Sequence, residues 1–308
     1  MGVGGVGGYY GARLAAAGRE VVFVTRGAAL AALRRDGLRV DSVRGDVWVR
    51  DVVATDDPSG EAPVDAVLLA VKTWQVAEAC EAARPLLGPG TVVVPLQNGV
   101  DAPSLAARVV GGGRVLPGTV KVFAETVGPG HVQHGSGPGT VTVGEWAGGP
   151  SARLARLGQA LDVPGVESEP VDDVWAALWT KFLFVAPLGA VGAVTRAPVG
   201  VLRSEPETRA LLVRAMREAE AVGRARGGAL APDVVDRMLA FLDAHDPSST
   251  TSLHRDVVAG RPSELEAWPG AVVRLGREVG VPTPVNGALY DVLLPLERRA
   301  RGQLTFET

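Results

Sequence analysis

The sequence predicts an α/β domain followed by an all-α domain, and three observations support this prediction. In the first half of the chain, short apolar runs alternate with stretches of helical period. From about Asp172 onward, nearly every segment has helical period. The length of 308 residues suits two domains better than one. We therefore expect two domains, 1–168 and 169–308, with the boundary near Ser168.

Three apolar runs predict the buried strands of the first domain. They occupy residues 21–24, 66–71 and 91–96 and alternate with helical patterns such as 11–17 and 74–87. Continuous apolar strands separated by helices indicate a parallel sheet covered on both faces. Two later runs, 130–135 and 140–144, predict separate antiparallel strands that close this domain.

The second half of the sequence predicts helices. Residues 208–226 place their apolar side chains on one stripe, and 284–301 predict a final helix. Ser263 and Glu266 fit a capping box, which predicts a helix that begins at Ser263. The most apolar run, 182–195, is too short to span a bilayer and predicts a buried helix.

The composition excludes several function classes. The net charge is -3 with both signs mixed along the chain, so we expect no nucleic-acid partner. Cys80 is the single cysteine, which excludes a disulfide framework and favours a reducing, cytoplasmic location. His131 and His134 point to opposite faces of a predicted strand, so we expect no metal site. No signal-peptide pattern is visible, and we expect no membrane association.

A glycine motif opens the sequence, where Gly2, Gly4 and Gly7 form the pattern G-x-G-x-x-G. In a phosphate-binding loop the first glycine permits a tight turn, and the second lets the backbone approach a pyrophosphate. The third allows close packing of helix on strand. With 40 glycines in the chain, a chance match to this motif is an alternative. The helical stretch and the strand that follow the motif strengthen its interpretation as a dinucleotide-binding loop. We therefore expect a Rossmann-type dinucleotide-binding domain.

Arg26 indicates which dinucleotide this domain prefers. It follows the predicted strand 21–24 and lies 19 residues after Gly7, where an NAD-binding protein places an acidic residue. A guanidinium pairs with phosphate through two hydrogen bonds, so Arg26 favours the 2′-phosphate of NADP. The alternative is a solvated loop charge.

A Rossmann glycine loop needs a strand before it, but only Met1 precedes Gly2 in this sequence. The missing strand would be the central one, and its loss would leave two neighbouring strands with unpaired backbone groups. We therefore expect that the sequence is truncated at its start. The alternative is that the fold tolerates the loss.

Several short motifs occur in a fixed order along the chain. They are the glycine segment 2–11, VKTWQ at 71–75, QNG at 97–99, WTKF at 179–182, TSLHRD at 251–256, SELE at 263–266 and GVPTP at 280–284. With these motifs the chain resembles the ketopantoate reductase (2-dehydropantoate 2-reductase) family over nearly its whole length, apart from the first strand. The resemblance implies NADPH-dependent reduction of a 2-oxo acid to a 2-hydroxy acid, as in pantothenate biosynthesis.

The resemblance also implies roles for individual residues of the substrate pocket. Lys181 matches the catalytic lysine that gives a proton to the carbonyl oxygen, and Glu264 matches its acidic partner. Ser252 matches a serine that holds the substrate carboxylate. Asn98 matches an asparagine at the junction of nicotinamide and substrate, so it also belongs to the cofactor site.

On the cofactor side, Lys72 and Gln75 match family residues near the adenosine-phosphate end, and Arg26 matches the 2′-phosphate contact. The resemblance implies NADP(H) as cofactor, a small 2-oxo acid as substrate and an active site between the two domains. The final helix, 284–301, leaves a homodimer open.

The chemistry of these residue types agrees with the implied roles. Hydride delivery to a ketone carbon leaves negative charge on the oxygen, and a nearby ammonium stabilises that charge and gives up its proton. Structural alternatives remain for both ionisable residues. Lys181 would be a lysine that extends from a helix edge to solvent, and Glu264 a glutamate that complements a helix dipole.

The chain departs from the family pattern beside the lysine. The family helix carries asparagines four and eight residues after the lysine, whereas this chain has Val185 and Gly189. Pro187 lies between them and is expected to kink or interrupt the helix. We expect a drier and roomier pocket, which favours a more apolar carbonyl substrate than ketopantoate. A non-enzymatic NADP(H)-binding sensor is the remaining alternative.

Overall fold

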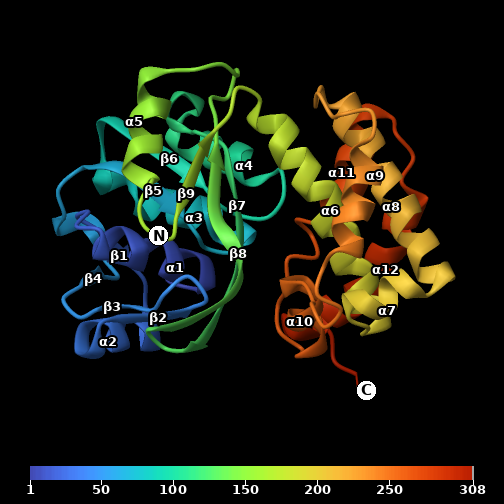
Figure 1. Cartoon of the computed structure of the whole chain (residues 1–308), viewed down its shortest axis with the longest axis horizontal. Coiled ribbons are helices and arrows are strands. Elements are labelled where there is room, and N and C mark those ends of the chain that lie inside the picture. The colour runs from blue at the N-terminus through green and yellow to red at the C-terminus, as the bar shows by residue number, and fades with distance from the viewer. Residues whose placement is uncertain (307–308) are drawn as a thin grey trace. The chain divides into compact units, whose positions relative to one another are not determined.

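The computed structural model describes residues 1–306 and divides into two compact units (Figure 1). The N-terminal unit comprises Met1–Gln97 and Ala102–Val174. The C-terminal unit comprises Asn98–Asp101 and the chain from Trp175 onward. The predicted order, an α/β domain before a helical domain, is confirmed.

The division between the two units falls after Val174 and not near Ser168. Ser168 lies in strand β9 (Glu167–Pro170), which pairs in parallel with β8 (His131–Val143). The backbone hydrogen bonds of this pairing keep the segment in the N-terminal unit. The segment Asn98–Asp101 groups with the C-terminal unit, although it lies in the first half of the sequence.

The N-terminal unit alternates helices and strands, as the apolar periodicity predicts. Besides β8 and β9, its elements are α1 (Gly5–Ala16), β1 (Val22–Val24), α2 (Gly27–Asp36), β2 (Leu38–Ser42), β3 (Val47–Val49), β4 (Val53–Thr55), η1 (Pro58–Gly60), β5 (Val64–Leu69), η2 (Thr73–Gln75), α3 (Val76–Ala82), η3 (Arg84–Leu86), β6 (Leu87–Pro95), α4 (Ala102–Val110), η4 (Gly112–Arg114), β7 (Gly118–Gly128) and α5 (Ala152–Leu161). The three predicted buried strands correspond to β1, β5 and β6. β1 pairs in parallel with β4, and β5 pairs in parallel with β6.

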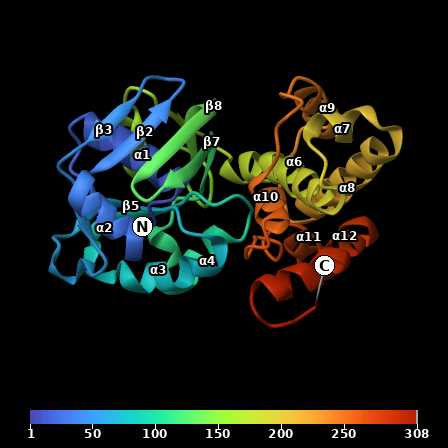
Figure 2. The same cartoon turned by 90° about the horizontal axis from the view of Figure 1, so that it is seen from below.

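A five-stranded sheet with the order β3-β2-β8-β7, and with β9 also paired to β8, forms the other layer of this unit. Helix α1 packs against β2, β3, β7 and β8, whereas α3 and α4 lie side by side (Figure 2). Tyr9 and Tyr10 of α1 are fully buried, and their hydroxyls donate to the carbonyls of Gly165 and Thr140 at 2.6 and 3.1 Å. These contacts fix α1, and with it the glycine loop that precedes it.

The prediction of two separate strands at 130–135 and 140–144 is wrong, because both belong to the single strand β8. The intervening glycines caused the error. Gly137 and Gly139 have φ angles of +95° and +73°, which suggest a turn from sequence. In the structure the ladder with β7 continues past them, with register shifts around Phe123. The strand therefore bends without ending.

The backbone of Met1 and Gly2 joins β1 to β5. The Gly2 N–H donates to the carbonyl of Val24 at 2.9 Å, and the Ala70 N–H donates to the carbonyl of Met1 at 2.9 Å. These two residues therefore lie where the central strand of a Rossmann sheet is expected, and they satisfy backbone groups of both neighbours. They also place the glycine loop at the carboxyl ends of β1 and β5.

The C-terminal unit is helical throughout its described part. Its helices are α6 (Val174–Thr195), α7 (Val199–Ser204), α8 (Pro206–Ala225), α9 (Val234–Asp243), α10 (Ser252–Val258), α11 (Pro269–Val279) and α12 (Pro284–Ala300). Helix α6 is long and apolar enough to cross a membrane, but 72% of its most apolar window is buried inside the protein. It is therefore the core helix that residues 182–195 predicted, and it runs through Pro187 without interruption.

The predicted helix start at Ser263 is wrong, because α11 begins at Pro269. Between these positions the chain forms turns, in which the Trp268 N–H donates to the Glu264 carbonyl at 3.0 Å. The Ser263 hydroxyl does not cap a helix and donates to Glu297 at 2.5 Å. The sequence pattern failed because the serine binds a carboxylate far along the chain, which a local motif does not reveal.

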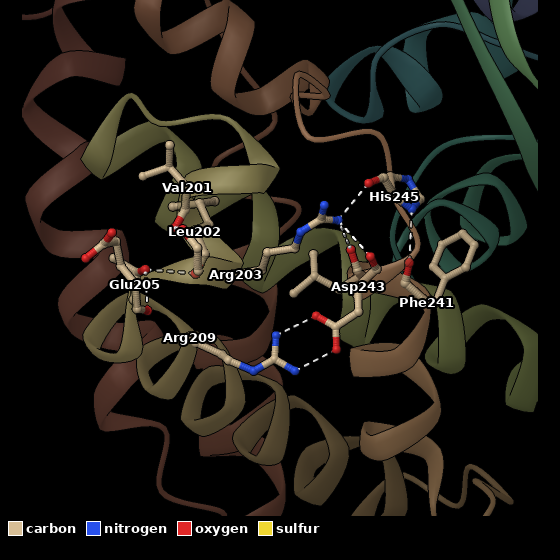
Figure 3. A network of polar contacts seen from close by, with 11 residues as sticks. Val201, Leu202, Arg203, Glu205, Arg209, Phe241, Asp243 and His245 are labelled. Atoms are coloured by element: carbon tan, nitrogen blue, oxygen red, sulfur yellow. Dashed lines mark hydrogen bonds and ion pairs between the residues drawn. The ribbon is translucent and has the colours of Figure 1, made fainter.

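Arg203 of α7 fixes the carboxyl end of α9 (Figure 3). Its guanidinium donates to the carbonyls of Leu242, Asp243 and His245 at 3.0, 2.9 and 2.7 Å. Arg209 of α8 binds the Asp243 carboxylate at 2.6 and 2.7 Å. The last carbonyls of a helix have no intrahelical partner, so Arg203 satisfies them and ties α7 to α9.

Candidate active site

At two of the three motif positions in the glycine loop, the structure leaves no room for a side chain. Gly2 has a φ of +85°, and a Cβ there would lie 2.8 Å from Cγ1 of Val71. A Cβ on Gly7 would lie 1.9 Å from the carbonyl oxygen of Gly2. The first and third glycines of the motif therefore serve the tight turn and the close packing that the sequence predicted.

Gly4 differs from its two partners, because a Cβ on Gly4 would meet nothing within 4 Å. Its φ of −87° is open to any residue, so neither strain nor packing explains this glycine. Gly4 is the N-cap of α1 and gives the helix no side-chain cap. The first N–H groups of α1 thus face a space that a side chain would fill, which is the cradle a pyrophosphate needs. The residues present fit a dinucleotide.

Arg26 lies two residues beyond Val24, whose carbonyl binds Gly2, so it stands beside the glycine loop. It is the N-cap residue of α2, and its side chain is 71% exposed. Its guanidinium contacts the carboxylate of Glu78 at 3.2 Å. An exposed ion pair of this kind is weak, so the guanidinium is available to a phosphate that approaches the loop.

Lys72 is the N-cap residue of the η2 turn and Gln75 is its last residue, and the turn follows β5. The Lys72 N–H donates to Oε1 of Gln75 at 3.3 Å, and the Gln75 N–H donates to the Lys72 carbonyl at 2.8 Å. The Lys72 ammonium lies 6.0 Å from the ring centre of Trp74. Because Val71 also contacts Gly2, the turn brings Lys72 and Gln75 to the same edge as the glycine loop.

Gln97 holds this edge together, and sequence reasoning assigned it no role. Its Nε2 donates to the carbonyls of Leu69 and Val71, each at 2.9 Å. The two carbonyl acceptors fix the orientation of the amide, so Oε1 points the other way. Among the described residues, that buried oxygen has no hydrogen-bond partner. The QNG motif contains Gln97 and was the signal that could have identified it.

In the C-terminal unit, Asn98 is held by Trp268. The indole N–H of Trp268 donates to the Asn98 carbonyl at 3.2 Å. Gly99, with a φ of +122°, lies so close that a Cβ would be 3.2 Å from the Ala267 carbonyl and 4.0 Å from Phe182. The QNG loop therefore contacts both the segment that carries Glu264 and the helix that carries Lys181.

Lys181 is half-buried in α6, next to the fully buried Phe182. Two turns further along, at Gly189, a Cβ would lie 2.7 Å from Cζ3 of Trp268 and 3.1 Å from Cδ2 of Leu253. Helix α6, the segment of Glu264 and the helix of Ser252 thus meet at Gly189. The structure brings together the segments of all four predicted pocket residues in one unit.

Glu264 and Ser252 occupy different local structures. Glu264 is 7% exposed and lies in the turn before α11, not in the first turn of a helix, so the alternative of a helix-dipole partner is wrong. Ser252 is half-buried and is the first residue of α10, whose N-cap Thr251 accepts a hydrogen bond from the His254 N–H at 3.2 Å. His254 of the same helix is buried against Gly192 of α6.

The expectation of a roomier pocket at Gly189 is wrong, because the indole of Trp268 fills that space. The expected dryness agrees with the residues present, since the neighbours of Gly189 are Trp268 and Leu253. Trp268 lies outside the motifs found in the sequence, and its packing against Gly189 is seen only in the structure. Its additional role as a hydrogen-bond donor to Asn98 required the structure.

The histidines and the cysteine of the N-terminal unit have structural surroundings. Among residues 1–306 there is no cluster of three or more His, Cys, Asp or Glu side chains suited to a metal ion. His131 binds Asp41 at 2.8 Å, and His134 is buried against Ser42 and Tyr9. Burial raises the pKa of the Cys80 thiol to about 11. His134 and Cys80 are therefore buried in the N-terminal unit, whereas His131 forms a partly exposed pair with Asp41.

A glycine cradle on an α/β unit, followed by a helical unit with ionisable groups among apolar neighbours, is typical of nicotinamide-dependent oxidoreductases. Sequence comparison identifies the family. The family described as ketopantoate reductase PanE/ApbA matches residues 1–148, and its C-terminal counterpart matches residues 173–297. The chain belongs to the ketopantoate reductase family and is an oxidoreductase of that family. This family uses a nicotinamide cofactor.

Relatives match over nearly the full length. The chain is 31% identical to a 2-dehydropantoate 2-reductase of Mesorhizobium japonicum, over 97% of this chain and 96% of the relative. The structure of a PanE/ApbA family ketopantoate reductase from Ralstonia eutropha superimposes with a TM-score of 0.89 at 32% identity, with 98% of each chain covered. D-mandelate dehydrogenase with NADH and anilino(oxo)acetate reaches a TM-score of 0.89 at 20% identity and 97% coverage of each chain, which shows a shared fold alone.

Proposed function

We propose that this protein reduces a 2-oxo acid to the 2-hydroxy acid with NADPH, and that Lys181 donates the proton. The observation that carries this proposal is the junction at Gly189, where α6 meets the segments of Ser252 and Glu264. Family membership supplies the class of reaction. The pantothenate-pathway substrate 2-dehydropantoate is the first candidate, because several full-length relatives are named for it.

The proposed mechanism distributes the work among four residues. The nicotinamide, when bound, supplies a hydride to the carbonyl carbon. Lys181 stabilises the negative charge that develops on the carbonyl oxygen and transfers its proton there, which completes the alcohol. The Ser252 hydroxyl donates to the substrate carboxylate, and Glu264 accepts from the new hydroxyl and orients the lysine. Asn98 positions the reacting carbon against the cofactor.

The preference for NADPH over NADH is part of the proposal and depends on Arg26. Replacement by glutamine removes the charge that would pair with a 2′-phosphate. We expect Arg26→Gln to raise the KM for NADPH by roughly tenfold or more, with little change for NADH. Arg35→Gln is the matched control, because Arg35 is an equally exposed arginine of the same helix. An unchanged NADPH preference in Arg26→Gln would refute this assignment.

A second candidate substrate class is a 2-oxo acid with a more apolar side chain. The observation that favours it is the replacement of two amides by Val185 and Gly189, together with the indole of Trp268 at the second position. Each lost amide removes about 1–3 kcal/mol of binding if it bonded a buried substrate group. Absorbance assays of NADPH consumption with ketopantoate, branched and aromatic 2-oxo acids distinguish the candidates. NADPH binding without turnover of any carbonyl would instead support a sensor.

A further inference from the structure

Glu297 of α12 is a buried carboxylate, 3% exposed, that the proposed mechanism does not use. It accepts from the Ser263 N–H at 3.1 and 3.0 Å and from the Ser263 hydroxyl at 2.5 Å. Arg301, the C-cap residue of α12, donates to Glu297 at 2.6 Å and to the Ser263 carbonyl at 3.1 Å. The amide, hydroxyl and carbonyl of Ser263 are therefore all bound by one helix.

This arrangement matters because Ser263 is the residue immediately before Glu264. The Glu264 segment is a turn outside α11, so the position of its side chains depends on the few hydrogen bonds that anchor the turn. On the C-terminal side of the turn, the N–H groups of Ala267 and Trp268 both donate to the Glu264 carbonyl at 3.0 Å. Contacts from α12 thus fix the direction in which the chain reaches Glu264.

We infer that Glu297 is a positioning residue for Glu264. The Glu297 carboxylate binds Ser263, the residue before Glu264, and Arg301 holds that carboxylate in place. The inference rests on the proposed function, because it assigns Glu264 to the substrate pocket. A buried carboxylate is stable only when its charge is paired and hydrogen-bonded, and Arg301 and Ser263 meet that need. A positioning group of this kind affects the reaction by fixing the turn, and with it the position of the Glu264 side chain.

Glu218 of α8 offers a matched control, because its carboxylate binds residues of α12. Its carboxylate accepts from the N–H groups of Val285 and Asn286 at 2.8 and 2.9 Å, and from Nδ2 of Asn286 at 2.8 Å. The chemistry is the same as at Glu297, a carboxylate that satisfies backbone and side-chain donors. Glu218 fixes the start of α12, however, whereas Glu297 fixes the residue beside Glu264.

The test compares Glu297→Gln with Glu218→Gln in the full-length protein. Four quantities are measured: kcat for the best 2-oxo acid, KM for the same substrate, NADPH affinity, and hydrogen exchange of a peptide that covers residues 261–270. For Glu297→Gln we expect kcat/KM to fall roughly tenfold or more, with faster exchange in that peptide and NADPH affinity within about twofold of wild type. Glu218→Gln should leave kcat/KM and this peptide unchanged.

Two further variants keep the test decisive if Glu297→Gln folds poorly. Glu297→Asp retains the charge and should recover part of the activity, and Ser263→Ala removes one donor and should cause a smaller loss. Wild-type exchange and wild-type kcat/KM in Glu297→Gln would overturn the inference, as would equal losses in Glu218→Gln. If the wild type reduces no carbonyl, the proposed function fails, and exchange of the 261–270 peptide alone still decides whether Glu297 orders the turn.

Discussion

The indole N–H of Trp268 donates to the backbone carbonyl of Asn98 across 170 positions of sequence, at 3.2 Å. The same indole packs against Gly189 of α6. Trp268 is 1% exposed, whereas Asn98 is half-buried. A single side chain thus sets the distance between the QNG loop and the helix that carries Lys181.

Trp268→Phe tests this relationship because phenylalanine keeps the packing and loses the donor. Because Asn98 is half-buried, loss of this hydrogen bond should cost about 0.5–1.5 kcal/mol. If that cost falls on the position of Asn98, kcat/KM should fall by about tenfold. Steady-state kinetics and thermal unfolding measured on the same preparation separate the two effects. A loss of stability with wild-type kinetics would show that Asn98 needs no support from the indole.

Gly4→Ala and Gly7→Ala should fail in different ways. A methyl group on Gly4 enters open space, so the fold should be retained, while NADPH affinity should fall by roughly tenfold or more because the cradle is filled. A methyl group on Gly7 would lie 1.9 Å from the Gly2 carbonyl oxygen, so this variant should lose about 1–3 kcal/mol of stability. NADPH titration and urea unfolding check the pair. Normal NADPH affinity in Gly4→Ala would contradict the cradle.

Gly189→Asn restores the residue type expected for the family and should nevertheless destabilise the protein. Its Cβ would lie 2.7 Å from Cζ3 of Trp268, an overlap that typically costs about 1–3 kcal/mol. The cost should largely disappear in a Trp268→Ala background, because the neighbour is gone. Urea unfolding of the two single variants and the double variant measures this coupling. Additive effects would mean that the indole does not occupy the site.

The stability of the protein should fall as the pH falls below about 6.5, in part because of His134. Burial lowers the pKa of His134 below its ordinary value of 6.5. The unfolded state therefore takes up this proton first, and stability is lost from about pH 6.5 down to the lowered pKa of the folded state. His134→Gln should flatten the slope of unfolding free energy against pH in this window. An identical slope in wild type and variant would exclude His134 as a source.

The apolar periodicity predicted most of the fold. Parallel strand pairs, the buried helix α6 and the order of the two domains follow directly from it. The exceptions depend on partners distant in sequence. Ser263 binds Glu297 instead of capping a helix, and β8 continues through Gly137 because β7 supports it. Local patterns contain no information about such partners.

The sequence suggested candidate site residues, but it did not suggest the residues that hold their segments in place. From the motifs we proposed Lys181, Ser252, Glu264 and Asn98, and their segments lie in one unit of the structure. The roles of Gln97 and Trp268 required the structure, because an amide or an indole in an apolar segment looks like packing. Whether Gly189 opened the pocket also depended on its neighbours, which the sequence does not show.

The central claim is that Lys181 donates the proton in reduction of a 2-oxo acid. The most direct test is NADPH consumption by Lys181→Met, with the product identified, on the best substrate of the 2-oxo acid panel. Lys121→Met is the matched control, because Lys121 is an exposed lysine of β7 paired with Glu169. We predict that Lys181→Met lowers kcat by about 10²–10⁴-fold with NADPH affinity retained, and that Lys121→Met has wild-type activity. Wild-type kcat in Lys181→Met would contradict the account.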